Sequence, residues 1–245
     1  MKISIVTVTR GDSAAILRRN LAGVASQTFG DIEHILVDGN DDESVCRDLA
    51  CEFPAVRLLR RPARGVYDAI NGGIEASTGD VIGLIHGNDR PASSHSLAEV
   101  AACFEEDEDL DFVYGDVSIV SAGADGSEHL SRYYSGADFS ESRMAAGCAP
   151  PHPSLFLRSE AVRRLGPYRT DMLICSDFDM FLRILRSGMR GRYLPGVRVV
   201  MTAGGISSTI ANRLAVSLRE KRRALRLNGV RSSMLRLVLG LRYKI

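Results

Sequence analysis

Residues 80–89 have the sequence DVIGLIHGND, and the fold class follows from this stretch. Its residues 81–85 are apolar except for one glycine, which indicates a strand buried on both faces, as central strands of parallel sheets are. The strand ends in a polar turn that finishes at Asp89. Ligands of open parallel sheets bind beyond the carboxyl ends of the strands, so Asp89 is a candidate ligand-binding residue.

Strand and helix patterns alternate along the chain on both sides of this stretch. β-Branched residues at 3–9 predict a first strand, and apolar residues at helical spacing in 13–27 predict the helix that follows it. The same alternation continues over strands at 32–37, 56–59 and 112–118 and helices at 43–53, 66–77 and 96–105. We expect an α/β fold with a mostly parallel central sheet flanked by helices, whose first half is Rossmann-like.

The second half of the chain has weaker patterns. Residues 122–147 are polar and Gly-rich, which predicts an irregular loop or lid. Short strands are expected at 154–157 and 192–200, with helices at 158–165 and 177–187. From residue 211 onward the chain becomes strongly basic, and we expect a helical, amphipathic tail over 211–245.

Composition limits the class of protein. A chain of 245 residues with 45% hydrophobic and 25% charged residues suits one large α/β domain or two small ones, and a net charge of +1 gives no reason to expect a nucleic-acid partner. The amino-terminal sequence lacks the apolar run of a signal peptide, so we expect a cytoplasmic protein. Five cysteines without paired spacing suggest reduced, structural thiols: Cys46, Cys51, Cys103, Cys148 and Cys175.

Three predicted strands end in an acidic residue, at Asp38, Asp89 and Asp116. Such residues are common in turns. Asp116 either reaches the acceptor or closes a turn, and the turn is the interpretation that we favour. Neither glycine-rich phosphate-binding motif of common α/β folds occurs in the sequence. A bound nucleotide would therefore need its diphosphate neutralised in another way, most simply by a divalent cation on a carboxylate, for which Asp89 is best placed.

A series of ordered motifs resembles the inverting family-2 glycosyltransferases with the GT-A fold, in the branch that assembles bacterial surface polysaccharides. The most specific motif is RGVYDAINGG at 64–73. The others are IVTVT at 5–9, VDG at 37–39, ASTGD at 76–80, GND at 87–89, HPS at 152–154, SDFD at 176–179 and GGIS at 204–207. The resemblance covers residues 1–208 and implies transfer of a sugar from a nucleoside diphosphate sugar to an acceptor hydroxyl.

The resemblance also implies site residues on the donor side. It assigns residues 1–118 to a nucleotide-sugar-binding half, in which Asp89 holds Mg²⁺ or Mn²⁺. The implied contacts to the nucleotide sugar are Thr9, Asp38, Asp68, Asn71 and Asn88. The family often has two adjacent acids at the metal motif, whereas here the first is Asn88, and weaker metal binding is one expectation.

On the acceptor side, the resemblance assigns residues 119–210 to an acceptor-binding half that completes a domain of residues 1–210. Asp177 matches the catalytic base, which takes a proton from the attacking hydroxyl. The dipole of its predicted helix favours the ionised carboxylate. His152 is a candidate acceptor-side residue, with a structural hydrogen-bond role as the alternative, and Asp179 is expected to position neighbouring groups.

Three interpretations stay open at this point. The chain is an active transferase, a degenerate member that binds a sugar nucleotide or partner transferase without turnover, or a nucleotidyltransferase, which would need an Arg-containing Gly-rich loop after the first strand. Residues 9–13 supply only a poor version of that loop. The basic tail is either a solvated helical face or an interfacial segment that contacts an anionic membrane. In the second case, the protein would lie at the cytoplasmic face of the membrane, and the acceptor would be a lipid-linked glycan.

Overall fold

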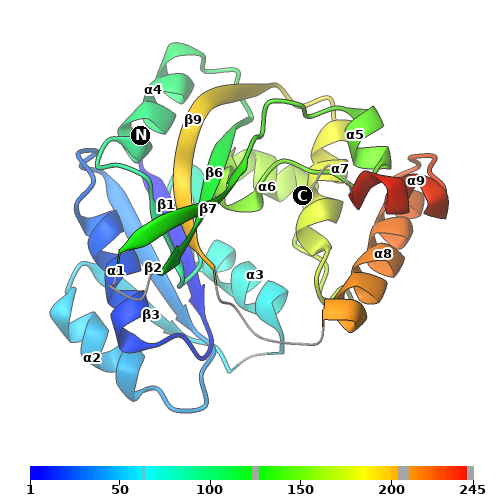
Figure 1. The fold of residues 1–245 in the computed structure, drawn as a ribbon. Coiled ribbons are helices and arrows are strands. Elements are labelled where there is room, and N and C mark those ends of the chain that lie inside the picture. Colours follow the sequence, from blue (N-terminus) through cyan, green and yellow to red (C-terminus); the bar gives the residue numbers. More distant parts are fainter. Residues whose placement is uncertain (63, 123–126, 204–209, 242–245) are drawn as a thin grey trace.

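The computed structural model describes residues 1–62, 64–122, 127–203 and 210–241. Helices and strands alternate over the first half, as the sequence predicts (Figure 1). The elements are, in chain order, β1 (Ile3–Thr9), α1 (Ala14–Ala25), β2 (Ile32–Asp38), α2 (Ser44–Glu52), β3 (Val56–Arg60), α3 (Val66–Ala76), β4 (Val81–Leu84), β5 (Asp89–Pro91), α4 (Ser96–Glu106), β6 (Phe112–Ala122), β7 (Glu128–Tyr134), α5 (Glu141–Ala145), the 3₁₀ helix η1 (His152–Ser154), β8 (Phe156–Arg158), α6 (Ser159–Leu165), α7 (Ser176–Arg186), β9 (Gly191–Thr202), α8 (Ile210–Leu227) and α9 (Met234–Gly240).

One sheet runs through the molecule in the strand order β3-β2-β1-β4-β8-β6-β9-β5, and β7 pairs with β6 beside this path. The pairs β3–β2, β2–β1 and β1–β4 are parallel, which confirms the Rossmann-like half. Beyond β4 the sheet is mixed, because β8 runs antiparallel to both β4 and β6 while β6 and β9 are parallel. This is the GT-A arrangement of a central sheet flanked by helices.

Helices cover both faces of the sheet because the strands alternate their apolar residues between two sides. Val6 and Val8 of β1 belong to one core cluster with residues of α3 and α7, whereas Ile3 and Ile5 belong to another with residues of α4. In β2, Leu36 packs with α1 and α2 in a third cluster. Because β1, β2 and β3 are parallel, their polar carboxyl ends lie at the same edge of the sheet.

The expectation that residues 122–147 form an irregular loop or lid is wrong for most of that stretch. The structure places a strand, β7, antiparallel to β6, and a short helix, α5, within it, while residues 123–126 lie outside the described residues. β7 is almost entirely exposed on both faces, so it lacks the alternation of apolar and polar residues that would predict a strand. Its Glu128 is anchored by ion pairs to Arg19 of α1 and Arg90 of β5.

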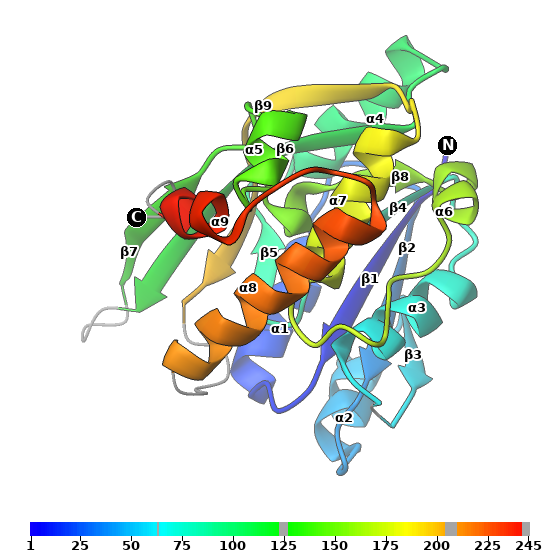
Figure 2. The same ribbon diagram turned by 90° about the vertical axis from the view of Figure 1, so that its right-hand side faces the viewer.

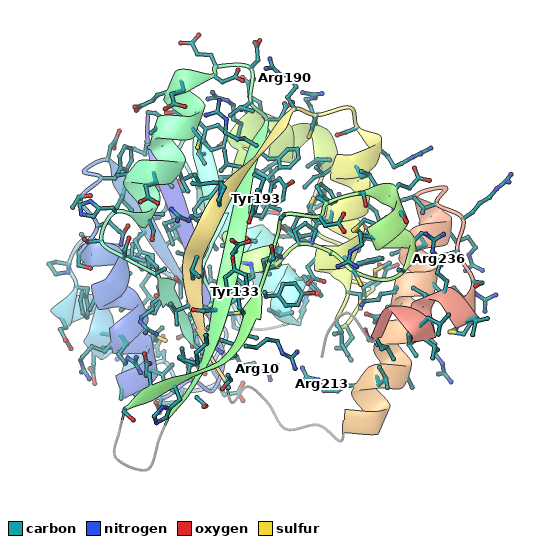
Figure 3. All side chains as sticks on the ribbon, turned by 45° about the horizontal axis from the view of Figure 1, so that its top comes forward. Arg10, Tyr133, Arg190, Tyr193, Arg213 and Arg236 are labelled. Atoms are coloured by element: carbon teal, nitrogen blue, oxygen red, sulfur yellow. The ribbon has the colours of Figure 1, made fainter. Side chains whose placement is uncertain are left out.

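Asp116 is not a turn residue but lies inside β6, with no exposed surface. Its carboxylate accepts hydrogen bonds from the hydroxyls of Tyr133 and Tyr193 and from the backbone N–H groups of Gly136 and Gly196. Figure 3 labels the two tyrosines, which come from β7 and β9. Burial alone would raise the pKa of Asp116, but these hydrogen bonds outweigh it and lower the pKa. The carboxylate therefore fastens β7 and β9 to β6.

The basic tail is helical, as predicted, and packs on the second half of the chain. α8 lies along α7, and α9 folds back beside α5 (Figure 2). Glu220 of α8 accepts hydrogen bonds from the backbone N–H groups of Leu173, Ile174 and Cys175, just before α7. The described helices include none that is long and apolar enough to cross a membrane. The division of the chain at residues 118 and 210 stays a prediction.

Replacement of Asp116 by Asn is expected to lower the free energy of unfolding by about 1–3 kcal/mol at pH 7, because an amide cannot accept all four hydrogen bonds. Since the folded-state pKa of Asp116 is lowered, its stabilisation is present above the unfolded pKa of about 3.9 and is lost as the pH falls through the folded value. Urea unfolding should show a difference in the free energy of unfolding between wild type and variant, and this difference should become smaller below about pH 4. Asp31→Asn, at an exposed site, is the control; a pH-independent gap for Asp116→Asn would contradict the assignment.

Candidate active site

Thr9, Asp38 and Arg60 lie side by side at the carboxyl edge of the parallel strands. The register pairs Thr9 with Asp38 and Asp38 with Arg60. Asp38 is fully buried, and its Oδ2 accepts a hydrogen bond from Arg60 Nη1 at 2.8 Å. Its Oδ1 accepts from the backbone and side-chain nitrogens of Asn40 at 2.9 and 2.8 Å. The Asp38 carboxylate is thus held in one orientation at the edge where the sequence predicts a nucleotide.

The loop after β1 lies against the turn after β4. Thr9 Oγ1 donates a hydrogen bond to Asp12 Oδ2 at 2.7 Å. The same carboxylate oxygen lies 2.5 Å from the position that a Cβ on Gly87 would occupy, so a larger residue there would require the Asp12 side chain to move. Arg10 is exposed beside this contact and, within the described part of the chain, makes no ion pair or hydrogen bond (Figure 3). The loop after β1 therefore places a carboxylate and a cation close to the turn after β4.

Asn20 of α1 holds the turn at residues 86–89 from inside the protein. Its side-chain nitrogen donates to the backbone oxygens of His86 and Asp89, both at 2.8 Å. Its Oδ1 accepts from Thr7 Oγ1, which also lies 2.9 Å from His34 Nε2. Because Asn20 is 1% exposed, this chain of hydrogen bonds is shielded from water and fixes the backbone that carries Asp89.

Asp89 begins β5, opposite Met201, and is 1% exposed. Neither of its carboxylate oxygens has a hydrogen-bond partner among the described residues. Burial raises the pKa of Asp89 to about 8, and the negative charge of Asp12 adds to that increase. A buried carboxylate without partners fits a bound cation, which would restore the charge balance that desolvation disfavours.

The surroundings of Asp89 limit how such a cation would be held. The described residues contain no group of three or more His, Cys, Asp or Glu side chains placed to hold a metal ion. The neighbouring Asn88 donates its side-chain N–H to the Thr202 backbone oxygen. Asp89 would therefore be one protein ligand, with water and ligand oxygens completing the coordination, as is common for Mg²⁺.

Asp68 and Asn71, at the start of α3, are engaged within the protein. Asp68 forms an ion pair with Arg61 at 3.0 Å, which lowers the pKa of the Asp68 carboxyl. Asn71 is 8% exposed, and both ends of its amide bind the backbone of Tyr168, at 2.8 Å each. Asn71 thus ties α3 to the loop before α7. Direct contact of either side chain with a nucleotide sugar stays a prediction.

Asp177 lines a largely apolar cavity of about 280 Å³ between β6, the η1 region, α7 and α8. It lies in the first turn of α7 and accepts a hydrogen bond from the Phe178 N–H at 2.7 Å. The hydroxyl of Tyr67 approaches the same oxygen at 3.4 Å. From α8, Ser217 and Lys221 contribute to the wall. The structure thereby places one carboxylate on the wall of a cavity that the basic tail helps to close.

His152 lines the same cavity, and its ring lies 6.0 Å from the ring of His86. Burial lowers the pKa of His152 to about 4, so the imidazole is neutral at neutral pH. Its Nε2 is 2.9 Å from the hydroxyl of Tyr168. The geometry accommodates both of the roles considered for His152, because the side chain is hydrogen-bonded in the interior and also borders the cavity.

Asp179 is fully buried and does not border this cavity. Its Oδ2 pairs with Arg169 at 3.2 Å and with Arg183 at 3.0 Å, and its Oδ1 accepts from the Asn228 side chain at 2.8 Å. These contacts join the loop before α7, α7 itself and the end of α8. Asp179 thus holds these segments in place. The motif at residues 204–207 lies outside the described residues.

Comparison with known proteins identifies the family. The family model of glycosyl transferase family 2 matches residues 4–163, which is more than half of the chain. This chain belongs to glycosyl transferase family 2.

Relatives of this family-2 chain include named biosynthetic proteins. A "PGL/p-HBAD biosynthesis glycosyltransferase" of Mycobacterium bovis is 31% identical over 210 residues, which cover 82% of this chain and 77% of the relative. An "O-antigen biosynthesis protein RfbC" of Myxococcus xanthus is 30% identical over 187 residues, which cover 74% of this chain but 14% of that protein.

Solved structures share the fold of this family-2 chain at low sequence identity. S. aureus TarS 1–349 in complex with UDP-GlcNAc has a TM-score of 0.69 at 13% identity, and the match covers 92% of this chain and 66% of that one. The mannosyltransferase PcManGT of Pyrobaculum calidifontis, in complex with GDP-Man and Mn²⁺, has a TM-score of 0.63 at 19% identity, over 91% and 64%. This chain spans about two thirds of the chains in those structures.

Four further residues contribute to the candidate site without a role predicted from the sequence: Asp12, Asn20, Arg60 and Lys221. Asn20 interrupts the apolar face of its helix, and a polar residue in such a position is a usable signal for a buried hydrogen bond. Arg60 could be found by aligning the ends of β2 and β3. Asp12 and Lys221 carry no such signal, because their places depend on loop shape and on helix packing.

Replacement of Asp89 by Asn is expected to stabilise the protein at alkaline pH in the presence of a chelator. The folded-state pKa of Asp89 is raised to about 8, so wild type loses stability as the pH rises from the unfolded value of about 3.9 towards 8. Asn cannot ionise and escapes that loss. Thermal unfolding with EDTA should give a variant whose melting temperature exceeds that of wild type by at least about 2 °C at pH 8.5, with a smaller difference at pH 5. Asp41→Asn, at an exposed site, serves as the reference, and a lower melting temperature for Asp89→Asn at pH 8.5 would refute the expectation.

Proposed function

We propose that this chain is a metal-dependent inverting glycosyltransferase that uses a nucleoside diphosphate sugar as donor. The observation that carries the proposal is the Asp177 carboxylate, which borders a cavity and lies in the first turn of α7. An inverting transfer is a single displacement, so one carboxylate must receive the proton of the attacking hydroxyl. Asp177 is the carboxylate among the residues that border this cavity.

The proposed donor site is the carboxyl edge of β1, β2 and β3. Asp38, oriented by Arg60, accepts hydrogen bonds from the base, and Thr9 lies beside it. Asp68, Asn71 and Asn88 are the further proposed contacts. Support comes from structural neighbours in complex with UDP-GlcNAc and with GDP-Man, both nucleoside diphosphate sugars.

The proposed metal ligand is Asp89, whose two oxygens have no partner in the described structure. Mg²⁺ or Mn²⁺ bound there would stabilise the departing diphosphate. The PcManGT structure contains Mn²⁺, which supports this part of the proposal. This chain's own residues contribute by holding the turn: Asn20 fixes the backbone of Asp89, and Gly87 leaves room for Asp12.

The proposed acceptor is a hydroxyl of a cell-surface glycan, lipid-linked and presented at the cytoplasmic face of the membrane. Two relatives carry names that refer to PGL/p-HBAD and to O-antigen biosynthesis. The cavity beside Asp177 has a mainly apolar wall, which suits a sugar ring or an apolar aglycone more than a highly charged group. His152 borders that cavity and is the proposed acceptor-side contact, while Asp179 positions α7.

A degenerate member that binds its ligand without turnover is the competing interpretation. Asn88 favours it, because the metal motif then has one carboxylate fewer. The retained carboxylates of Asp89 and Asp177, one without partners and one on the cavity wall, favour activity. The match to glycosyl transferase family 2 argues against the nucleotidyltransferase interpretation.

A screen of nucleoside diphosphate sugars with Mg²⁺ or Mn²⁺ is expected to identify a donor that wild type hydrolyses slowly, because water can replace the acceptor. Asp177→Asn should reduce the release of nucleoside diphosphate by about 10²–10⁴-fold, the usual contribution of a general base, while donor affinity stays within about twofold. Asp171→Asn is the matched control, since Asp171 is an exposed acid in the loop just before α7. Equal release by wild type and Asp177→Asn would refute the assigned base, and binding without release by wild type would favour the degenerate form.

Removal of the metal is expected to abolish donor hydrolysis, and excess Mn²⁺ should restore it. Asp89→Asn should raise the Mn²⁺ concentration for half-maximal binding by at least about tenfold, because the variant loses the charged ligand. Titration of Mn²⁺ into the protein with nucleoside diphosphate, followed calorimetrically, measures this without turnover. Donor hydrolysis that proceeds unchanged in EDTA would contradict metal dependence.

A further inference from the structure

The last helix, α9, presents two different faces. Leu237 and Gly240 are buried on one face, whereas Met234, Leu235 and Val238, together with the adjacent Leu239, are exposed on the other. Leu235 is 68% exposed. Within the described residues, ten large hydrophobic side chains are exposed, and four of them lie in this one short helix. Such a concentration of apolar surface indicates that something covers it.

The charge around this face points to the kind of partner. Residues 221–245 contain eight Lys and Arg residues and no Asp or Glu, although the whole chain has a net charge of only +1. Arg222 and Arg226 of α8 and Arg231 of the α8–α9 connection are exposed. Arg236 of α9 is held by hydrogen bonds to Ser142 (Figure 3). Apolar side chains flanked by an excess of cations match the surface of an anionic lipid bilayer.

The buried face of α9 connects this surface to the proposed acceptor cavity. Leu237 Cδ2 lies 3.0 Å from the position that a Cβ on Gly147 would occupy, and Gly147 borders the cavity of Asp177. Gly240 packs on Ala146, and Lys221 of α8 donates to the Gly147 backbone oxygen at 2.6 Å. The segment 146–147 is therefore the wall between the cavity and α9.

We infer that the outer face of α9, formed by Met234, Leu235, Val238 and Leu239, docks on an anionic lipid bilayer and brings the cavity of Asp177 to the level of the headgroups. The inference deepens the proposed function, because a lipid-linked acceptor would then enter the cavity from the membrane. Docking itself needs no turnover, since it depends on the apolar face and the surrounding cations.

The test is co-sedimentation of the full-length chain with vesicles of phosphatidylcholine alone or of phosphatidylcholine with phosphatidylglycerol. Wild type should pellet with the anionic vesicles, less so at about 0.5 M NaCl, and not with the neutral ones. The double variant Leu235→Asp, Val238→Asp should bind the anionic vesicles at least about tenfold more weakly than wild type, because two charges enter the apolar face. Leu130→Asp, at a 66% exposed leucine of β7, is the matched control and should bind like wild type.

Two results would overturn the inference: wild type that stays in the supernatant with anionic vesicles, or a double variant that binds as wild type does. If a second copy of the chain covers α9 instead, wild type will be dimeric by light scattering, the double variant monomeric, and vesicle binding absent, which also overturns it. Donor hydrolysis without vesicles should be the same in wild type and double variant. Vesicle binding by a protein that hydrolyses no donor would separate failure of the proposed function from failure of the docking surface.

Discussion

The parallel pairing of β1 between β2 and β4 is the constraint on which the candidate site depends. Because all three strands run in one direction, their carboxyl ends meet at one edge, and side chains far apart in the sequence become neighbours. Thr9 and Asp38 are paired directly by the register. The turn after β4 reaches the same edge, where Asn20 fixes it through the backbone oxygens of His86 and Asp89. The parallel pairing of the strands thus sets the positions of Thr9 and Asp38, and the buried side chain of Asn20 fixes the turn at residues 86–89.

The buried carboxylates of this protein fall into two groups. Asp38, Asp116 and Asp179 are all fully buried, and each is surrounded by arginine, tyrosine, amide or backbone donors. Asp116 and Asp179 stabilise neighbouring strands and loops, and Asp38 is held in one orientation, since the charge of each is satisfied within the fold. Asp89 is buried to a similar degree but has no donor among the described residues. This contrast supports the proposal that Asp89 is the carboxylate that holds a cation.

The parallel half of the fold could be predicted from the sequence because each of its strands is a short apolar run with a helical pattern after it. The strand ends at Asp38 and Asp89 were visible for the same reason. β7 could not be predicted, because an exposed edge strand carries no apolar alternation. The sequence does not predict the buried position of Asp116 inside β6, since it depends on tyrosines that follow Asp116 by 17 and 77 residues. The cavity of Asp177 was also hidden, as its wall includes side chains from α8.

The attachment of Gly147 to the tail has a consequence for the order in which the site is completed. Gly147 is held by Lys221 of α8 and by Leu237 of α9, both of which follow it in the chain by more than seventy residues. A ribosome makes β1 to β4 first, so the proposed donor edge has all of its strands while the tail is still being synthesised. The wall beside Asp177 closes only when α8 and α9 have emerged and packed. In a nascent chain the strands of the proposed donor edge are therefore complete well before the cavity is, because the cavity needs the tail.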